Sequence, residues 1–464
     1  MKKLLLLAFC LFSLRLAAQW QAFTPNIPDT VGIQALDAVD EHTAWAVAIK
    51  YFVDSAGYQP AGSDKGYYVR TTDGGATWSA GILLMGQVPS FSNVSAIHAD
   101  TAWVAGLDYG DFSNHLVRTV DGGQTWTPQL TEGFQQPTSY INFVHFWDAQ
   151  NGIACGDPSA SDTDTTLFFE IWRTGDGGQT WARVPAANIP PSLPDEYGLA
   201  ASFSAHGQYI WFTTSSYSAT PVPGRVFRSA DKGLHWEVFE TGLHSLVYFS
   251  FADTSRGAVA TFDFTIEELQ LQVTQDGGAT WTDAVLPDKQ HKLASLVAVP
   301  GSGFLVLVYF DDPVSGPFVT MLSKDMGATW QQIGSGELAG WAAFAGPTAG
   351  YAGEWQPVDH ATRMYRYNGS PLSGLLSGQA LQAELSGFPN PVSDRLTVRV
   401  KTVKPADFLL LLNDAQGHLL RQQSADPGRT EWATTVDVQD LPAGTYFLTI
   451  TCAEGSAQQT VVKM

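Results

Sequence analysis

The sequence is poor in charge, and beyond its first residues it has no long apolar segment. Charged residues make up 15% of the 464 residues, against roughly 25% in a typical globular domain. Asp and Glu (45) outnumber Lys and Arg (25), giving a net charge of −20. This balance argues against nucleic-acid binding, which needs cations opposite phosphates. No apolar run after residue 20 reaches the ~18 residues of a membrane span, so no transmembrane segment is expected in the mature chain.

Cysteine is also scarce, with three in the whole chain. Cys10 lies in the N-terminal segment described next, and Cys155 and Cys452 fall in different predicted domains. A disulfide framework is therefore not expected, and the fold has to be stabilised by packing.

The N-terminus has the pattern of a secretory signal peptide. Lys2 and Lys3 precede the apolar run 4–14, and Leu16, Ala17 and Ala18 offer small or apolar residues for cleavage. This order of regions predicts a signal peptide over residues 1–18. A short membrane anchor is the alternative, but the apolar run is short for a span.

A nine-residue repeat dominates the rest of the chain. Its first copy reads RTTDGGATW and ends at Trp78, and the Trp residues of the six copies follow one another at spacings of 48, 55, 55, 45 and 49 residues. Periods of this length with strand-like content are typical of β-propeller blades. The repeat Asp and Trp residues are Asp73, Trp78, Asp121, Trp126, Asp176, Trp181, Asp231, Trp236, Asp276, Trp281, Asp325 and Trp330.

The residues of the repeat indicate a turn between two strands. Its Asp can accept hydrogen bonds from the backbone N–H groups just after it, and the following Gly allows a positive φ. Its Trp can begin the next strand and pack between neighbouring sheets. The repeat resembles the Asp-box, or BNR, repeat of sialidases, sortilin-type receptors, some glucan hydrolases and photosystem-assembly-factor propellers. The resemblance implies a β-propeller in which the repeat is structural and lies away from the ligand face.

A second motif gives the number of blades and the way in which the ring closes. Strand-like segments such as TAWAVA (43–48) and TAWVAG (101–106) recur seven times, once more than the complete repeat. The seventh repeat ends at Asn368-Gly369 without a Trp strand, whereas Gln19-Trp20 opens a strand of that type. We therefore predict a seven-bladed propeller over residues 19–370, in which residues 19–24 pair antiparallel with residues 363–368 and Trp20 packs as Trp78 does. Six blades are the alternative.

The C-terminal part is predicted to be a separate β-domain. Residues 371–386 are expected to be a linker, and short β runs broken by turns over residues 387–464 indicate a small immunoglobulin-like β-sandwich. The fold class is thus all-β. This module resembles the type A sorting domain of the type IX secretion system of Bacteroidota. The motif residues are Pro389, Asn390, Pro391, Leu441, Pro442, Gly444, Tyr446 and Lys463.

That resemblance implies export through the periplasm to the outer cell surface or the medium, with the secretion translocon as a partner. The alternative is an adhesive immunoglobulin-like domain that stays attached. Both interpretations place the propeller outside the cell.

The propeller face opposite the repeat turns is the predicted ligand face. It is built from the loops that connect the second to the third strand within each blade, here called the b–c loops, and from the d–a loops that lead to the next blade. This side is called the b–c face, and its b–c loops are rich in acids and aromatic residues. Carboxylates that accept hydroxyl protons, beside flat rings that cover C–H faces, suit sugars, whereas carboxylates alone suit cations or basic peptides. The expected ligand is a glycan or an extracellular protein. The alternative is that the acids are solvated loop charges and the rings are the ends of buried strands. The candidates are Tyr51, Asp54, Asp108, Tyr109, Asp111, Asp263, Asp311, Asp312, Glu354 and Trp355.

Enzymatic alternatives are weaker. Sialidase activity needs three arginines around the substrate carboxylate, but most propeller arginines occupy a scaffold position three residues before the repeat Asp. A glycoside hydrolase needs only two facing carboxylates, which makes it the second candidate function. No catalytic residue and no cofactor is assigned, although Asp157, Asp162 and Asp164 offer oxygen ligands for calcium.

Overall fold

A computed structural model describes residues 20–368 and 383–464 except for short segments. These segments are 28–30, 55–56, 61–64, 87–88, 131, 135–138, 162–163, 218–221, 245, 247, 264–266, 290–292, 311–317, 336–339, 355–361, 403–408, 414–418, 425–429 and 453–454. The predicted signal peptide 1–18 lies outside the described residues. Within them, the 3-10 turn η1 (Ala186–Asn188) is the one helical segment, and none is long and apolar enough to cross a membrane.

The described strands between residues 20 and 367 form seven antiparallel sheets, which are called blades 1 to 7 in chain order. Blade 1 contains β2 (Val31–Ala38), β3 (Ala44–Asp54), β5 (Gly66–Thr71) and β6 (Ser79–Leu83), with β4 (Gly57–Pro60) paired to β3. Blade 2 contains β7 (Pro89–Ala96), β8 (Ala102–Asp108), β9 (Asn114–Thr119) and β10 (Thr127–Pro128). Blade 3 contains β11 (Ile141–Phe146), β12 (Gly152–Ser161), β13 (Asp164–Thr174) and β14 (Ala182–Arg183). Blade 4 contains β15 (Glu196–His206), β16 (Tyr209–Ser216), β17 (Pro223–Ser229) and β18 (Glu237–His244).

The remaining sheets continue the same order of strands. Blade 5 contains β19 (Tyr248–Phe251), β20 (Gly257–Asp263), β21 (Glu268–Thr274) and β22 (Thr282–Asp283). Blade 6 contains β23 (Leu293–Ala298), β24 (Leu305–Phe310), β25 (Phe318–Ser323) and β26 (Gln331–Ser335). Blade 7 contains β27 (Gly340–Gly346), β28 (Ala349–Glu354), β29 (Met364–Tyr367) and, from the other end of the chain, β1 (Trp20–Phe23).

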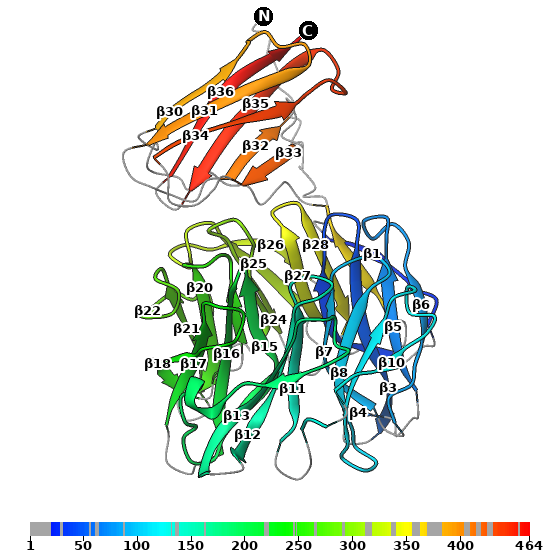
Figure 1. The fold of residues 1–464 in the computed structure, drawn as a ribbon. Coiled ribbons are helices and arrows are strands. Elements are labelled where there is room, and N and C mark those ends of the chain that lie inside the picture. The colour runs from blue at the N-terminus through cyan, green and yellow to red at the C-terminus, as the bar shows by residue number, and fades with distance from the viewer. Residues whose placement is uncertain are drawn as a thin grey trace, which may run out of the picture.

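The first strands of the blades form the inner ring of the propeller (Figure 1). Each contacts the first strand of the next blade, from β2 through β7, β11, β15, β19 and β23 to β27, and β27 contacts β2 again. Side chains on this ring accept backbone N–H groups of the next blade: Ala96 donates to Asp37 Oδ2 at 2.7 Å, and Phe146 donates to Ser95 Oγ at 3.0 Å. These bonds satisfy buried amides between sheets, which would otherwise cost free energy.

The N-terminal strand closes the ring, and its predicted pairing is confirmed. β1 pairs antiparallel with β29, and Trp20 lies opposite Tyr367. Gln21 lies opposite Arg366, as Ser79 lies opposite Arg70 in blade 1. Trp20 therefore occupies the position in blade 7 that Trp78 occupies in blade 1. The pairing covers the side of β29 that would otherwise be an open edge, which limits edge-to-edge association.

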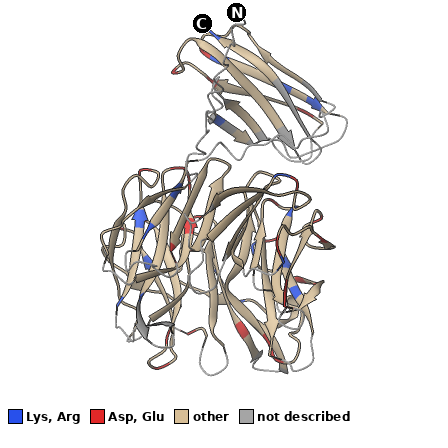
Figure 2. Ribbon diagram, turned by 180° about the vertical axis from the view of Figure 1, so that it is seen from behind, with Lys and Arg blue, Asp and Glu red and all other residues tan. Residues whose placement is uncertain are grey.

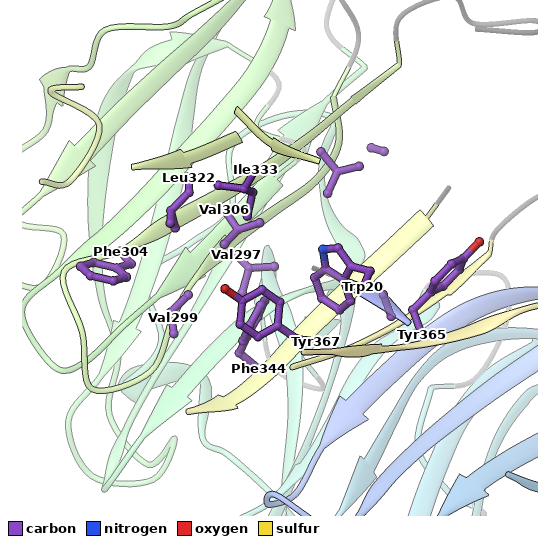
Figure 3. Packing of buried hydrophobic residues seen from close by; sticks show 13 residues of the cluster. Trp20, Val297, Val299, Phe304, Val306, Leu322, Ile333, Phe344, Tyr365 and Tyr367 are labelled. Carbon is purple, nitrogen blue, oxygen red and sulfur yellow. The ribbon is translucent and has the colours of Figure 1, made fainter. Parts of the chain in front are cut away.

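Trp20 joins blades 6 and 7 through apolar packing (Figure 3). Its ring is 3% exposed and meets Phe344 and Tyr367 edge-on, with centroids 5.8 and 5.4 Å away. The same cluster includes Val297 and Phe304 of blade 6. The repeat Trp78 behaves alike, because it packs edge-on against Tyr351 of the preceding blade.

The C-terminal unit consists of two sheets that share one core. The first contains β30 (Ala383–Phe388), β31 (Arg395–Thr402) and β34 (Glu431–Asp437). The second contains β32 (Leu409–Asn413), β33 (Leu419–Ser424), β35 (Gly444–Cys452) and β36 (Gly455–Lys463). Leu396 and Val398 of the first sheet and Leu448 and Ile450 of the second belong to the same buried cluster. Because β30 begins at Ala383, strand structure starts within the segment 371–386 that the sequence suggested as a linker.

Candidate functional site

The repeat turns use the polar groups of their Asp residues internally. Asp73 Oδ1 accepts the Thr77 N–H at 2.9 Å and the Thr71 hydroxyl at 2.9 Å, while its Oδ2 accepts the Thr77 hydroxyl at 2.6 Å. The N–H group therefore comes from four residues after the Asp rather than directly after it. The same contacts recur at Asp121, Asp176, Asp276 and Asp325, and Asp231 makes them with Ser229 and His235.

These contacts also hold the carboxylates in the ionised form. The Thr125 hydroxyl and N–H lower the pKa of Asp121 to about 2, because hydrogen bonds to a carboxylate favour its charged form. In each copy of the repeat a further hydrogen bond closes the turn. In the first copy the Gly75 N–H donates to the Thr71 hydroxyl at 2.8 Å. Gly75 has a φ of +84°, a conformation that suits glycine.

The repeat Trp and Arg residues lie between blades. Trp126 packs against Trp45 and Tyr68 of blade 1, and the following strand starts one residue after the Trp. Arg70 donates to the Ala99 carbonyl of blade 2 at 2.6 Å and covers the Trp45 ring. The polar and aromatic groups of the repeat thus connect neighbouring sheets.

The b–c loops lie on the opposite face, but the structure describes only some of the predicted ligand residues. The backbones of Tyr51, Asp54 and Asp263 lie in β3 and β20, with side chains that are not described, and Asp311, Asp312 and Trp355 lie outside the described residues. Four candidates have described side chains: Asp108, Tyr109, Asp111 and Glu354.

Glu354 forms a buried ion pair within blade 7. It is 1% exposed, and its Oε1 accepts Arg363 Nη1 at 3.1 Å and the Tyr365 hydroxyl at 2.7 Å. Burial raises the pKa of Glu354, and the bonds from Tyr365 and Arg363 oppose this shift. The side chain is therefore committed to the scaffold and not directed at a ligand, which corrects its selection as a ligand candidate.

Asp108 and Asp111 shape the blade 2 loop that carries two exposed rings. Asp108 Oδ1 accepts the Gly110 N–H at 2.7 Å, and Asp111 Oδ1 accepts the Ser113 N–H at 2.9 Å. Tyr109 and Phe112 of this loop are 51% and 50% exposed, and their rings meet edge-on with centroids 6.4 Å apart. The acids order the loop and the aromatic rings face solvent.

A second group of rings on this face, two of them exposed and one half-buried, was not among the predicted residues. Tyr197, at the start of β15, and Tyr217, directly after β16, stack in parallel with centroids 4.1 Å apart and an interplanar angle of 14°. Tyr140, which directly precedes β11, is also exposed. The b–c loop of blade 4 opens with Ser215-Ser216-Tyr217 and has no acid, so a search for acids beside rings passed over it. Tyrosines at those strand ends that border this face were the sequence signal from which the group could have been predicted.

Asp157, one of the possible calcium ligands, has an internal role. Its Oδ1 accepts the Asn142 side-chain N–H at 2.9 Å and the Gly198 N–H at 2.9 Å, and burial raises its pKa. The side chain of Asp164 and all of Asp162 lie outside the described part. Within the described part no group of three His, Cys, Asp or Glu residues could hold a metal ion, so calcium at this loop stays a prediction.

The predicted sorting-motif residues lie close together where the two C-terminal sheets meet. The side chain of Asn390 donates to the Thr460 carbonyl at 2.8 Å and accepts the Val462 N–H at 2.8 Å. The Tyr446 hydroxyl donates to the Pro442 carbonyl at 2.7 Å. These bonds tie the start of the unit to its last strand.

Comparisons with known proteins separate the two parts of the chain. Residues 386–464 match the family model of the secretion system C-terminal sorting domain. A sequence comparison with curated proteins finds no match. Among solved structures, YCF48 bound to D1 peptide is similar over 76% of this chain and 96% of its own, with a TM-score of 0.50 and 16% identity.

Two further similar structures are carbohydrate-active enzymes. The GH74 xyloglucanase from Xanthomonas campestris is 11% identical with a TM-score of 0.45, covering 82% of this chain and 59% of its own. The Hadza microbial sialidase Hz136 is 14% identical with a TM-score of 0.40, covering 61% and 63%. At these identities the likeness to YCF48 shows the fold alone. Residues 386–464 match the sorting domains of type IX secretion, which send a protein to the cell surface or the medium, and the described strands between residues 20 and 367 form a β-propeller.

Proposed function

We propose that this protein is a secreted or surface-displayed binding propeller that recognises a glycan or an extracellular protein through its b–c face. Export by way of a signal peptide and the periplasm, with the secretion translocon bound by the C-terminal domain, belongs to the same proposal. The observation that carries it is the gathering of exposed aromatic side chains on that face, in the adjacent blades 2 to 4.

Several features of these rings support a binding role. Most large apolar side chains of a folded domain are buried, so a local group of exposed rings marks an interaction site. Tyr109, Phe112 and Tyr217 are each at least half exposed, and each meets another ring. Such pairs offer a rigid contact surface at little conformational cost.

Binding without hydrolysis is better supported than a glycoside hydrolase. A hydrolase needs two carboxyl groups that face the scissile bond. Asp108 and Glu354 are buried and bonded within the protein, and the partly buried Asp157 is bonded through its Oδ1. These three carboxylates thus fix the protein itself, and exposed aromatic rings lie in the same blades as Asp108 and Asp157.

The test is a binding and hydrolysis screen of the purified secreted protein. It uses a glycan array, a panel of extracellular proteins and polysaccharide substrates with reducing-end detection. We expect a ligand that is retained without new reducing ends and whose binding is weakened by the double change Tyr109→Ala and Phe112→Ala. Val120→Ala is the control, since Val120 is 55% exposed in a repeat turn on the opposite face. Release of reducing sugar, or loss of binding in the Val120 variant alone, would refute the proposal.

A further inference from the structure

The stacked pair Tyr197–Tyr217 has the properties of a built recognition surface. Tyr217 is 78% exposed, yet its ring is fixed by the parallel stack on Tyr197. Partial burial raises the pKa of Tyr217, and Tyr197, Asp157 and Tyr140 act electrostatically in the same direction. An exposed ring held in one orientation loses little side-chain entropy when a partner covers its open face.

Asp157 of blade 3 fixes the backbone beside this pair. Its carboxylate accepts hydrogen bonds from the Asn142 side chain and from the N–H of Gly198, the residue next to Tyr197. The Asp157 N–H in turn donates to the Tyr140 carbonyl at 3.0 Å. One partly buried acid therefore fixes the backbones that carry Tyr140 and Tyr197, although the two belong to different blades.

In blade 4, a buried ion pair fixes the residue that precedes Tyr197. Arg225 Nε donates to Glu196 Oε1 at 2.8 Å, and Glu196 is the immediate neighbour of Tyr197. Glu196 also accepts the Leu193 N–H and the Thr214 hydroxyl, and Arg225 donates to the Pro191 carbonyl at 3.0 Å. Buried charges cost desolvation energy that the bonds of this network offset, and the bidentate pairing of Arg225 with Glu196 defines the geometry beside Tyr197. The rim of β15–β17 is thus held more firmly than packing alone requires.

The charges around the pair indicate the class of ligand. The protein carries a net charge of −20, which repels acidic glycans. The three arginines of the flanking strands β14 and β17 are all engaged: Arg183 donates to the Ser159 hydroxyl at 2.7 Å, Arg225 pairs with Glu196, and Arg228 pairs with Glu237. An anionic sugar would therefore find no unengaged arginine on these strands, whereas the C–H face of a neutral pyranose can lie flat on the electron-rich face of a tyrosine.

We propose that the Tyr197–Tyr217 stack, with Tyr140 beside it, is the sugar-stacking subsite of the b–c face and takes a neutral pyranose glycan. This subsite rests on the binding function proposed above and names its ligand class. It lies in blades 3 and 4, apart from the Tyr109–Phe112 pair of blade 2.

The experiment is affinity electrophoresis and titration calorimetry of the full secreted chain with neutral and acidic probes. The neutral probes are β-glucan, xylan, mannan and their hexasaccharides, and the acidic probes are polygalacturonate and sialyllactose. Tyr217→Ala should weaken neutral-glycan binding at least ~10-fold, as truncation of a central aromatic contact does. Tyr217→Phe keeps the ring, so its affinity should stay within ~3-fold of the wild-type value, and Val120→Ala should not change the affinity. Because Tyr217 is largely exposed, all variants should keep the wild-type melting temperature.

Other results would overturn the subsite. If a neutral glycan binds and Tyr217→Ala leaves its affinity unchanged while the Tyr109/Phe112 double variant loses it, the binding function stands and this subsite is wrong. If the wild type retains only acidic probes, or only extracellular proteins, the ligand class is wrong while the binding function stands. If no probe and no protein partner is retained, both proposals fail.

Discussion

Replacement of Trp20 by Ala tests whether the N-terminal strand closes the propeller. The ring is nearly fully buried between Phe344, Tyr367 and the apolar side chains of blade 6. Truncation of such a side chain costs ~3–5 kcal/mol through lost transfer energy and a residual cavity. An unfolding entropy of about 2.1 cal/mol/K per residue over the about 350 residues of the propeller gives about 0.7 kcal/mol/K. The melting temperature should therefore fall by roughly 4–7 °C.

Two matched variants separate packing from closure. Trp20→Phe keeps most of the apolar ring and removes a buried indole N–H that has no partner, so its melting temperature should fall less than that of Trp20→Ala. Trp78 is the corresponding residue of blade 1, whose strands follow one another in the chain. Trp78→Ala should lower the melting temperature about as much as Trp20→Ala does.

Deletion of residues 19–26 is the decisive change, because it removes β1 and leaves β29 as an open edge. The truncated chain should melt well below either Trp variant and associate in light scattering, since an unpaired strand edge is a template for other chains. A monomer with a wild-type melting temperature after this deletion would refute closure by β1. Differential scanning calorimetry and sedimentation give both readouts.

The sorting domain, the repeat turns and the inner ring each predict a separate measurement. Deletion of residues 386–464 should leave a folded propeller inside the cell envelope, and normal amounts of it in the medium would contradict a sorting role. The pKa of Asp121 is lowered to about 2, so its stabilising contribution should be lost as pH falls from about 4 to 2; urea midpoints of Asp121→Asn should then drop less over that range than those of the wild type. Burial raises the pKa of Asp37 to about 6, so ionisation of Asp37 should cost stability as pH rises from about 4 to 6. The stability of Asp37→Asn relative to the wild type should consequently rise over that interval. A difference in stability that is the same at about pH 4 and about pH 8 would contradict this.

The repeat made the scaffold predictable from sequence because its period is locally encoded. Each copy carries the turn, the positive-φ glycine and the Trp within nine residues, so strand order and turn positions follow directly. The closing strand was predictable for the same reason: Trp20 stands alone at one end of the chain and a Trp is missing at the other. Its register against β29 follows from the position that Trp78 occupies in blade 1.

The ligand face was less predictable because burial there depends on contacts that a loop sequence does not show. Glu354 looked like an acid on an open rim, but Arg363 and Tyr365 lie nine and eleven residues further along the chain and reach it only through the β28–β29 pairing. Tyr197 and Tyr217 are twenty residues apart and meet only because the ends of β15 and β16 are neighbours. Composition located the face, and the tertiary fold decided which of its residues point to solvent.

The two faces of the propeller divide stability and recognition between them. On the repeat face, the polar groups of each turn are bonded to one another and its Arg and Trp bind the next blade, so substitutions there act on folding. On the b–c face Asp108 and Asp157 fix loops, and exposed rings such as those of Tyr109 and Tyr217 contribute little to the core, so under the proposed function substitutions of these rings are expected to act on ligand binding. The two classes of variant should therefore have different effects. Trp126→Ala should lower the melting temperature and leave the affinity of the folded fraction unchanged, whereas Tyr217→Ala should lower the affinity and leave the melting temperature unchanged. A repeat-face variant that stays fully stable and loses the ligand would show that this division of the molecule is wrong.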